Sequence, residues 1–213
     1  MTPRASPAAA KTSQADRRSR TRAALVTAAA QEISRHGYSD MVLERVARDA
    51  GYTRGALYHL FASKEDLALA VVEWVGTSWY DEVGLLLDKE NDPVGTLIAV
   101  ARENAVYFRH DVARVLTRLR TELFGLDHPV GRTAEQAFAH MVADITRLVA
   151  QGRETGAIPP GPPPRVLALA YLGSMEGVVD QLSGQTSFDA VCAERATLGV
   201  LGLPPTPESS ESG

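Results

Sequence analysis

The sequence of 213 residues predicts an all-α protein of about nine helices. Apolar residues recur three and four positions apart through most of the chain, which is the period of one helix face. Aromatic residues make up only 6% of the chain, and alanine, leucine and valine are abundant, as is typical of packed helices. Glycine and proline divide the periodic segments into lengths that suit helices. A chain of this length can bury a substantial core as one large or two small domains.

The first helix is predicted over Arg18–His36, and Gly37 ends it. Its apolar stripe consists of Leu25, Ala28, Ala29 and Ile33. Residues 1–16 are rich in Ala, Pro, Ser and Thr and show no periodicity. We expect them to be disordered, because they bury too little surface to offset the entropy of ordering.

Two short helices separated by a tight turn follow within residues 42–61. The apolar face of the first consists of Leu43, Val46, Ala47 and Ala50. Gly51 can end that helix in the left-handed conformation without steric cost, and Thr53 is a good N-cap for the second. The second helix carries Leu57 and Phe61 one turn apart and is too short to be stable alone. This is the arrangement of a helix-turn-helix, whose second helix enters the major groove of DNA.

Six further helices are predicted from the same period and from caps such as Ser63, which has Asp66 at the capping-box position. They span about Ser63–Asp88, Pro93–Phe108, Asp111–Phe124, Val130–Glu154, Pro164–Ser183 and Ser187–Leu201. The Pro-rich stretch at residues 156–164 is expected to be an extended linker. The helix that follows it is apolar nearly all round, so one side should pack on the protein and the other on a partner subunit.

The charge is divided unevenly along the chain. Residues 1–66 hold 11 Lys/Arg and 7 Asp/Glu, a net charge of +4, whereas residues 67–213 hold 11 and 19, a net charge of −8. A basic N-terminal segment joined to an acidic remainder is typical of a DNA-binding domain fused to another domain. We therefore expect a disordered arm at 1–16, a helix-turn-helix domain at 17–66, a second helical domain at 67–203, and a disordered tail at 204–213.

Several classes of protein find no support in the sequence. Cys192 is the single cysteine, so no disulfide can form within the chain, which suits a reducing compartment. The chain shows no signal-peptide pattern, and its longest apolar run, at 166–179, is too short to span a membrane. We expect a cytoplasmic protein. No catalytic motif is present, and His140 and Asp144 alone do not make a metal site, so we expect no enzyme activity, metal or cofactor.

The segment AGYTRGALYHLFASKEDL, residues 50–67, resembles the signature of TetR-type transcriptional regulators. The resemblance covers about residues 19–79. The matching positions are Gly37, Tyr38, Val46, Ala47, Ala50, Gly51, Gly55, Leu57, Tyr58, Phe61, Lys64 and Leu67. It implies an N-terminal three-helix DNA-binding domain and a C-terminal helical domain for ligand binding and dimerisation. The sequence departs from the family where a hydroxyl would cap the helix near Met41 or Val42, so we expect Ser39 or Asp40 to cap it instead.

The expected DNA contacts come from two regions. By the resemblance, Arg54, Gly55, Tyr58, His59 and Lys64 contact DNA. By their chemistry, Thr53 suits a phosphate, Ala56 can offer a methyl group to thymine, and Arg54 can bond guanine bidentately. The arginines at the start of the first helix, Arg18 and Arg20 above all, form either a solvated face or contacts to phosphates or the minor groove.

The remaining expected sites lie in the second domain. The candidate ligand-binding residues are Trp74, Tyr107, His110, Phe124, Met141 and Met175, because they are large or polar groups on inward faces. Trp74 or Trp79 could report on a ligand, although core packing alone explains a tryptophan more often. The candidate dimerisation residues are Val166, Leu169, Leu172, Val179, Cys192 and Leu198, since in the family the last two helices form a four-helix dimer bundle.

The sequence therefore predicts a homodimeric regulator that binds a palindromic double-stranded DNA operator. The resemblance favours a repressor released by a small effector, and the few charges on the chosen faces favour an apolar or aromatic one. Two alternatives remain open: a TetR-type activator, and a helical ligand-binding protein whose DNA-binding segment is degenerate.

Overall fold

The computed structural model describes residues 13–88, 92–110, 112–182 and 188–205. Within these ranges it contains nine α-helices, one 3₁₀ helix and no β-strand, which confirms the all-α prediction. The elements are α1 (Gln14–His36), α2 (Leu43–Asp49), α3 (Arg54–Tyr58), α4 (Lys64–Glu82), η1 (Gly84–Asp88), α5 (Pro93–Tyr107), α6 (Val115–Glu122), α7 (Pro129–Glu154), α8 (Pro164–Gln181) and α9 (Asp189–Leu201).

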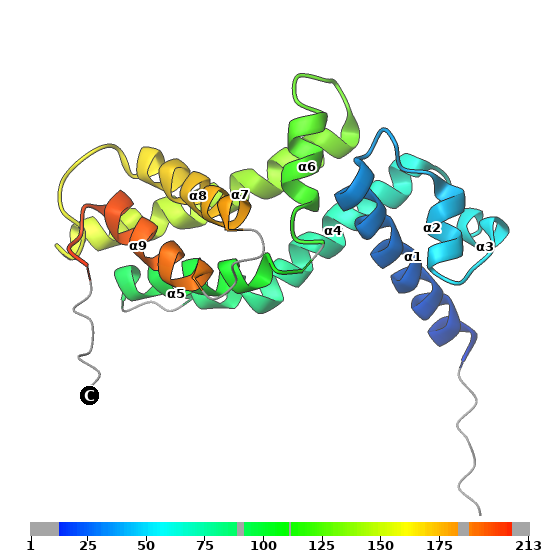
Figure 1. Ribbon diagram of the computed structural model, residues 1–213, viewed down its shortest axis with the longest axis horizontal. Helices are drawn as coiled ribbons and strands as arrows, with labels where there is room; N and C mark the ends of the chain where they lie inside the picture. The colour runs from blue at the N-terminus through cyan, green and yellow to red at the C-terminus, as the bar shows by residue number, and fades with distance from the viewer. Residues whose placement is uncertain (1–12, 89–91, 111, 183–187, 206–213) are drawn as a thin grey trace, which may run out of the picture.

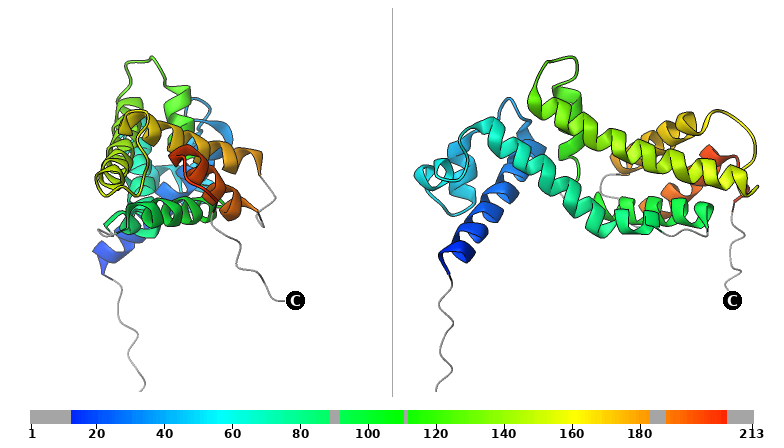
Figure 2. Two further views of the ribbon diagram at one scale, coloured as in Figure 1. Left: turned by 90° about the vertical axis from the view of Figure 1, so that its left-hand side faces the viewer. Right: turned by 180° about the vertical axis from the view of Figure 1, so that it is seen from behind.

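The molecule is elongated, and the three N-terminal helices form a small head at one end (Figures 1 and 2). The other helices form the body, in which α5 packs on α9 and α7 packs on α8. α4 leaves the head and continues along the body (Figure 1). α4 is therefore one continuous helix that connects the two parts.

The buried apolar residues form two cores, and α4 contributes to both. The first core joins the head helices to the first two-thirds of α4, to α6 and to the start of α7. The second lies among α5, α7, α8 and α9, with Trp79 of α4 packed against it. α6 and the N-terminal end of α7 therefore belong to the head's core, although they follow the head by about 50 residues or more in sequence.

The helix-turn-helix forms for the local reasons predicted. Gly51 adopts a left-handed φ of 77° between α2 and α3. Thr53 caps α3, its hydroxyl accepting from the backbone N–H of Ala56 at 3.2 Å. Leu57 and Phe61 are buried in the first core, which holds a five-residue helix that would not persist in water alone.

α1 begins earlier than predicted because of an N-terminal capping box. The Ser13 hydroxyl accepts from the N–H of Asp16 at 3.1 Å, and the Asp16 carboxylate accepts from the N–H of Ser13 at 3.0 Å. This reciprocal cap stabilises a helix start at Gln14. The prediction of disorder is thus wrong for residues 14–16, while residues 1–12 of the predicted arm lie outside the described residues.

The start of α2 also differs from the prediction. Its N-cap is Val42, which makes no side-chain cap, so the prediction that Ser39 or Asp40 caps it is wrong. The carboxylate of Glu32, on α1, accepts instead from the N–H of Val42 at 3.4 Å and from Nε of Arg45 at 2.6 Å. A side chain from another helix replaces the local hydroxyl.

Boundaries in the body are shifted by a few residues. α4 ends at Glu82 and η1 follows, since Gly84 is a poor former of α-helix. Asp111, Ser183 and Ser187, which were predicted as helix ends, lie outside the described residues, as does the tail beyond residue 205. Across the described ranges, no helix combines the length and the apolar character that crossing a membrane requires.

Candidate functional site

The outer surface of α3 carries most of the predicted DNA contacts. Thr53, Arg54, Gly55, Tyr58 and His59 are exposed, and Ala56 is half-buried. Leu57, on the opposite face, is fully buried. Tyr58 is 44% exposed, so it is not a core aromatic. The head thus displays these six neighbouring residues on one short helix.

Arg54 is held by two contacts within the head. Its Nη1 lies 2.5 Å from Oε1 of Glu44 on α2, and its Nη2 donates to the Tyr58 hydroxyl at 3.4 Å. The guanidinium also lies over the Tyr58 ring, 5.4 Å from its centroid. If Arg54 contacted a base, its guanidinium would lose the ion pair with Glu44 and form hydrogen bonds to the base in the groove.

Lys64 is the first residue of α4, and its side chain reaches the turn between α1 and α2. Its Nζ donates to the carbonyl oxygen of Ser39 at 2.8 Å and lies 5.0 Å from the Tyr38 ring centroid. The expected phosphate contact therefore starts from an ammonium group that is already placed by the head's own backbone.

Arg18 and Arg20 are exposed near the start of α1, and they face different directions. Arg22 packs over Phe61, just beyond α3, at 5.5 Å from the ring centroid. Arg18 lies one helical turn before Arg22 and shares its face, whereas Arg20 points elsewhere. Helical geometry thus places Arg18, rather than Arg20, on the same side of α1 as Arg22.

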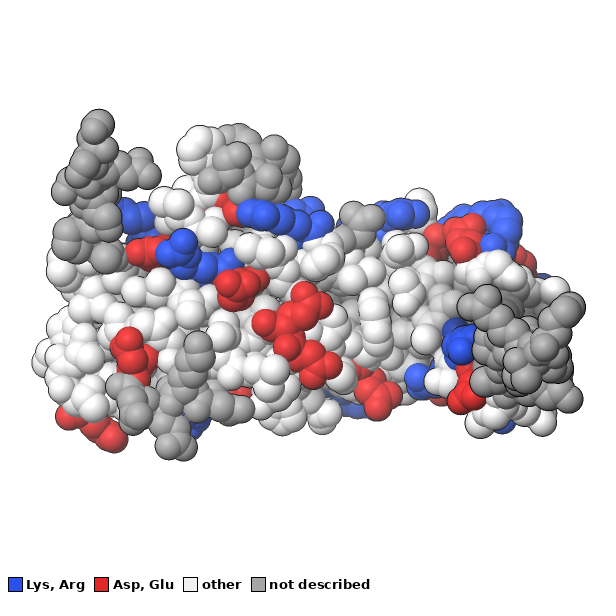
Figure 3. All heavy atoms as spheres, turned by 90° about the horizontal axis from the view of Figure 1, so that it is seen from below, with Lys and Arg blue, Asp and Glu red and all other residues white. Residues whose placement is uncertain are grey.

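The positive charge of the head is partly paired. Arg45, Arg48 and Arg54 each lie within ion-pair distance of an acidic side chain. On the face seen in Figure 3, acidic side chains gather over the middle of the molecule, while Lys and Arg lie mainly along one edge. Several of the arginines of the N-terminal segment are therefore paired with acidic side chains, and the head displays fewer unpaired positive charges than its number of arginines suggests.

A carboxylate from α6 joins the body to the head. Glu122 accepts from the N–H of Tyr38 at 2.7 Å and from the N–H of Ser39 at 2.6 Å. Gly37 has a φ of 85°, and a Cβ there would lie 2.5 Å from Oε2 of Glu122. Partial burial raises the pKa of Glu122, but these hydrogen bonds and nearby Arg118 outweigh it, so the net pKa is lowered. Sequence reasoning did not find this link, because it joins residues more than 80 positions apart.

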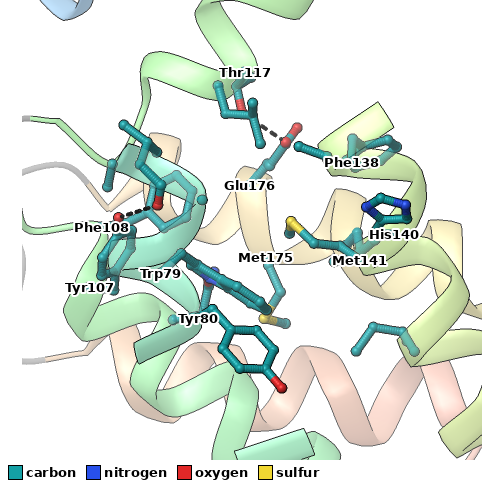
Figure 4. A pocket seen from close by; sticks show the side chains of 18 of the residues that line it. Trp79, Tyr80, Tyr107, Phe108, Thr117, Phe138, His140, Met141, Met175 and Glu176 are labelled. Atoms are coloured by element: carbon teal, nitrogen blue, oxygen red, sulfur yellow. Dashed lines mark hydrogen bonds between the residues drawn. The ribbon is translucent and has the colours of Figure 1, made fainter. Parts of the chain in front are cut away.

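The body contains a cavity of about 280 Å³ among α4, α5, α6, α7 and α8. Its walls are mainly aromatic and aliphatic. The large apolar residues that line it are Trp79, Tyr80, Tyr107, Phe108, Leu116, Phe138, Met141, Ile145, Tyr171, Leu172 and Met175. Figure 4 shows Trp79, Phe138, Met141 and Met175 around the same space, which suits a small organic ligand.

Polar groups enter the cavity at a few places. Trp79 Nε1 donates to Oδ1 of Asn104 at 2.9 Å, and the Thr117 hydroxyl donates to Oε1 of Glu176 at 3.0 Å. Burial raises the pKa of the Tyr107 phenol. His140 and Asp144 both line the cavity, but the described residues contain no cluster of three or more metal-binding side chains.

The structure brings three of the six predicted ligand-binding residues to the cavity. Tyr107, Met141 and Met175 line it, whereas the other three predictions are corrected. Trp74 packs against the head's core, Phe124 is 87% exposed, and His110 is exposed, 3.7 Å from Glu82. Helical period identifies an inward face but cannot tell a core from a cavity further along the same helix, so it does not distinguish Trp74 from Trp79.

The predicted dimerisation residues fall into two groups. Val166 is 50% exposed and Leu169 43% exposed on the outer face of α8, and Cys192 is half-buried on α9. Leu172, Val179 and Leu198 are buried within the chain, so their assignment to a surface is corrected. Phe188 and Val191 at the start of α9 are also apolar and exposed, 59% and 57%, and the sequence analysis does not predict them as dimerisation residues.

Comparisons with known proteins agree with this arrangement. The model of the family described as bacterial regulatory proteins, tetR family, matches residues 25–71. The A-factor receptor protein of Streptomyces griseus is 31% identical over 157 residues, which are 72% of this chain and 52% of that protein. The chain therefore spans about half the length of this relative.

Two solved structures share the fold. A TetR-family transcriptional regulator from Streptomyces coelicolor superposes with a TM-score of 0.72 at 21% identity, over 86% of this chain and 95% of that one. AibR in complex with isovaleryl coenzyme A and operator DNA superposes with a TM-score of 0.69 at 24% identity, over 88% and 100% of the two chains. The sequence match in the helix-turn-helix and the common fold of head and body lead to one assignment: the chain belongs to the TetR family of bacterial regulatory proteins.

Proposed function

We propose that this chain is a sequence-specific transcriptional regulator whose head binds operator DNA and whose cavity binds a small effector. The observation that carries the proposal is the joint presence of an exposed helix-turn-helix surface and an apolar cavity on the two ends of α4. AibR is solved with an acyl coenzyme A and with operator DNA, and the relative from Streptomyces griseus is a receptor. Both support a regulator that responds to a ligand.

The protein acts as a homodimer through α8 and α9 in this proposal. Val166 and Leu169 on α8 and Phe188 and Val191 on α9 are apolar side chains that the single chain leaves exposed. Gly173 and Gly177 on α8 have open space where a Cβ would stand, so a second helix can approach closely there. Two heads would then bind half-sites about 34–36 Å apart, which is one turn of DNA.

The effector acts as a release signal for a repressor in this proposal. It binds more tightly to a state in which the two heads are badly spaced for successive major grooves, and so shifts the population away from DNA. Two connections can carry the shift: α4, whose Trp79 lines the cavity, and α6, which carries Thr117 at the cavity and Glu122 at the head.

The test is selection of bound sequences from a random duplex pool with purified protein. We expect enrichment of a palindrome with half-sites one turn apart, and loss of affinity as salt increases. Arg54→Ala should reduce the enrichment, whereas Arg102→Ala, which removes an equal charge from α5 in the body, should leave it unchanged. If low salt gives no enrichment with protein refolded free of ligand, the head is degenerate and the chain is a ligand-binding protein.

A further inference from the structure

We propose that the effector carries a hydrogen-bond donor, a hydroxyl or an ammonium group, on an apolar body, and that the carboxylate of Glu176 accepts this donor. The inference rests on the proposed function, because it assigns the chemistry of the effector cavity. The inference also narrows the range of possible effectors, because it excludes ligands whose polar end is an anion.

The apolar body has a defined place in the cavity. Trp79 of α4, Phe138 and Met141 of α7 and Met175 of α8 surround one space (Figure 4). Their rings and thioethers contact apolar groups favourably and offer few hydrogen bonds. At about 280 Å³, the cavity lies at the small end of the range for ligand sites. A single ring with a short chain fits this description.

Glu176 is the polar group that enters this space from α8. Its side chain lies between Thr117 and Phe138 (Figure 4), and the Thr117 hydroxyl donates to one of its oxygens. Among the residues that the structure describes, no cation lies within ion-pair distance of Glu176. A carboxylate accepts several hydrogen bonds, so it retains capacity to accept one from a ligand.

Arg120, the arginine of the cavity wall, is already engaged. Its Nε lies 2.9 Å from Oε2 of Glu135, and its guanidinium stacks 3.4 Å from the centroid of the Phe138 ring. It is therefore a poor partner for an anionic ligand, which would have to displace Glu135.

A second carboxylate adds negative potential to the same cavity. Asp144 lines it from α7, and its nearest cation is Arg147 at 3.9 Å. Two carboxylates against one paired arginine disfavour a carboxylate or phosphate on the ligand, because like charges repel strongly in a partly dry site. An ammonium group gains further from the face of Trp79.

The experiment compares three probes with one body and three polar ends: 4-phenylbutylamine, 4-phenylbutanol and 4-phenylbutanoate. The full-length Trp74→Phe variant is used, because Trp79 in the cavity is then the only tryptophan, and its fluorescence reports binding. We expect the amine and the alcohol to bind about 10- to 100-fold more tightly than the carboxylate at pH 7, which is the ratio for hydrogen bonds to charged groups.

Variants at residue 176 test whether Glu176 causes the difference in affinity among the three probes. Glu176→Gln should weaken binding of the amine about tenfold or more and improve binding of the carboxylate. Glu176→Asp keeps the charge and should keep the order of the three probes. Glu154→Gln, at the end of α7 away from the cavity, is the matched control and should change none of the affinities.

Each outcome separates the two proposals. Equal affinities, or tighter binding of the carboxylate, would overturn the assignment of the polar end while leaving the cavity as the effector site. If no probe alters Trp79 fluorescence, although the protein still enriches a palindrome, both the cavity assignment and this inference fail. The DNA-binding part of the proposed function then stands alone.

Discussion

In the proposed function Arg54 contacts DNA, and its side chain is already restricted by contacts within the head. Its guanidinium is exposed yet bonded to Glu44 and Tyr58, so its position is restricted before any duplex arrives. Restricting a long side chain in advance lowers the entropy lost on binding. If Arg54 contacts a base, its ion pair with Glu44 is lost on binding, so we expect Glu44 to affect the affinity for DNA.

Replacing Arg54 by alanine should relax the sequence preference at one base pair, at a cost of about 1–3 kcal/mol there. The reason is the loss of a bidentate donor that no neighbour on α3 can replace. Competition binding with duplexes that differ at each position measures this change. A uniform loss across all positions would show that Arg54 contacts phosphate instead.

Glu44→Gln should tighten binding to duplex DNA, because it frees Arg54 and removes a negative charge beside α3. Asp49→Asn removes an equal charge at the far end of α2 and serves as control. The affinities of both variants are measured at several salt concentrations. Unchanged affinity in Glu44→Gln would mean that the Arg54 pair persists on DNA.

Lys64→Ala should weaken binding to all sequences alike and reduce the salt slope by about 1, because an ammonium group contacts a phosphate and not a base. The plot of affinity against salt concentration measures the slope. Loss of affinity with an unchanged slope would instead assign Lys64 to holding the turn at Ser39.

At the scale of elements, α6 is the helix whose role is least visible in the sequence. It is eight residues long, contributes Val115 and Leu119 to the head's core, and places Thr117 at the cavity. Glu122 at its C-terminal end accepts two N–H groups of the α1–α2 turn. α6 therefore links the cavity to the head in parallel with α4.

Glu122→Gln should destabilise the protein by about 1–3 kcal/mol near neutral pH, since hydrogen bonds to a charged group are lost. The pKa of Glu122 is lowered in the folded state. Its stabilisation is therefore complete above the ordinary value of 4.5 and is lost as the pH falls through the lowered pKa.

Thermal unfolding of both proteins between pH 3 and pH 8 tests this prediction, with Glu154→Gln as control. The difference from the wild type should be constant above about pH 5 and should narrow below the ordinary carboxyl pKa. A difference that does not change with pH would show that packing, and not the charge, explains the effect.

At the scale of the whole molecule, the outer face of α8 is the proposed interface between subunits. Leu169→Glu should separate the subunits and abolish cooperative operator binding, because it places a charge in the proposed interface. Leu172→Ala, three residues away but buried, should instead lower the stability of the chain by about 2–5 kcal/mol. Sedimentation and thermal unfolding distinguish the two effects. A Leu169→Glu protein that remains dimeric would place the interface elsewhere.

Local pattern was sufficient for the helix-turn-helix. Gly51, Thr53 and Ser63 are where a turn and two caps were predicted, because each acts on backbone groups within three residues of itself. It failed at Val42, whose N–H is satisfied by Glu32 on another helix. Local pattern also failed at the start of α1, because the composition of residues 1–16 predicted disorder although Ser13 and Asp16 form a capping box there.

The sequence by itself determined the nine α-helices of the described residues, the family of the head and the exposed residues of α3, but it did not predict the 3₁₀ helix η1. Periodicity and caps are properties of one helix, and they are readable without its neighbours. Only the tertiary structure decided that Trp79 rather than Trp74 lines the cavity, that Leu172 faces inward, and that Glu122 meets the α1–α2 turn. These depend on how helices pack side by side, and spacing along one helix carries no information about which neighbour, or which cavity, its inward face will meet.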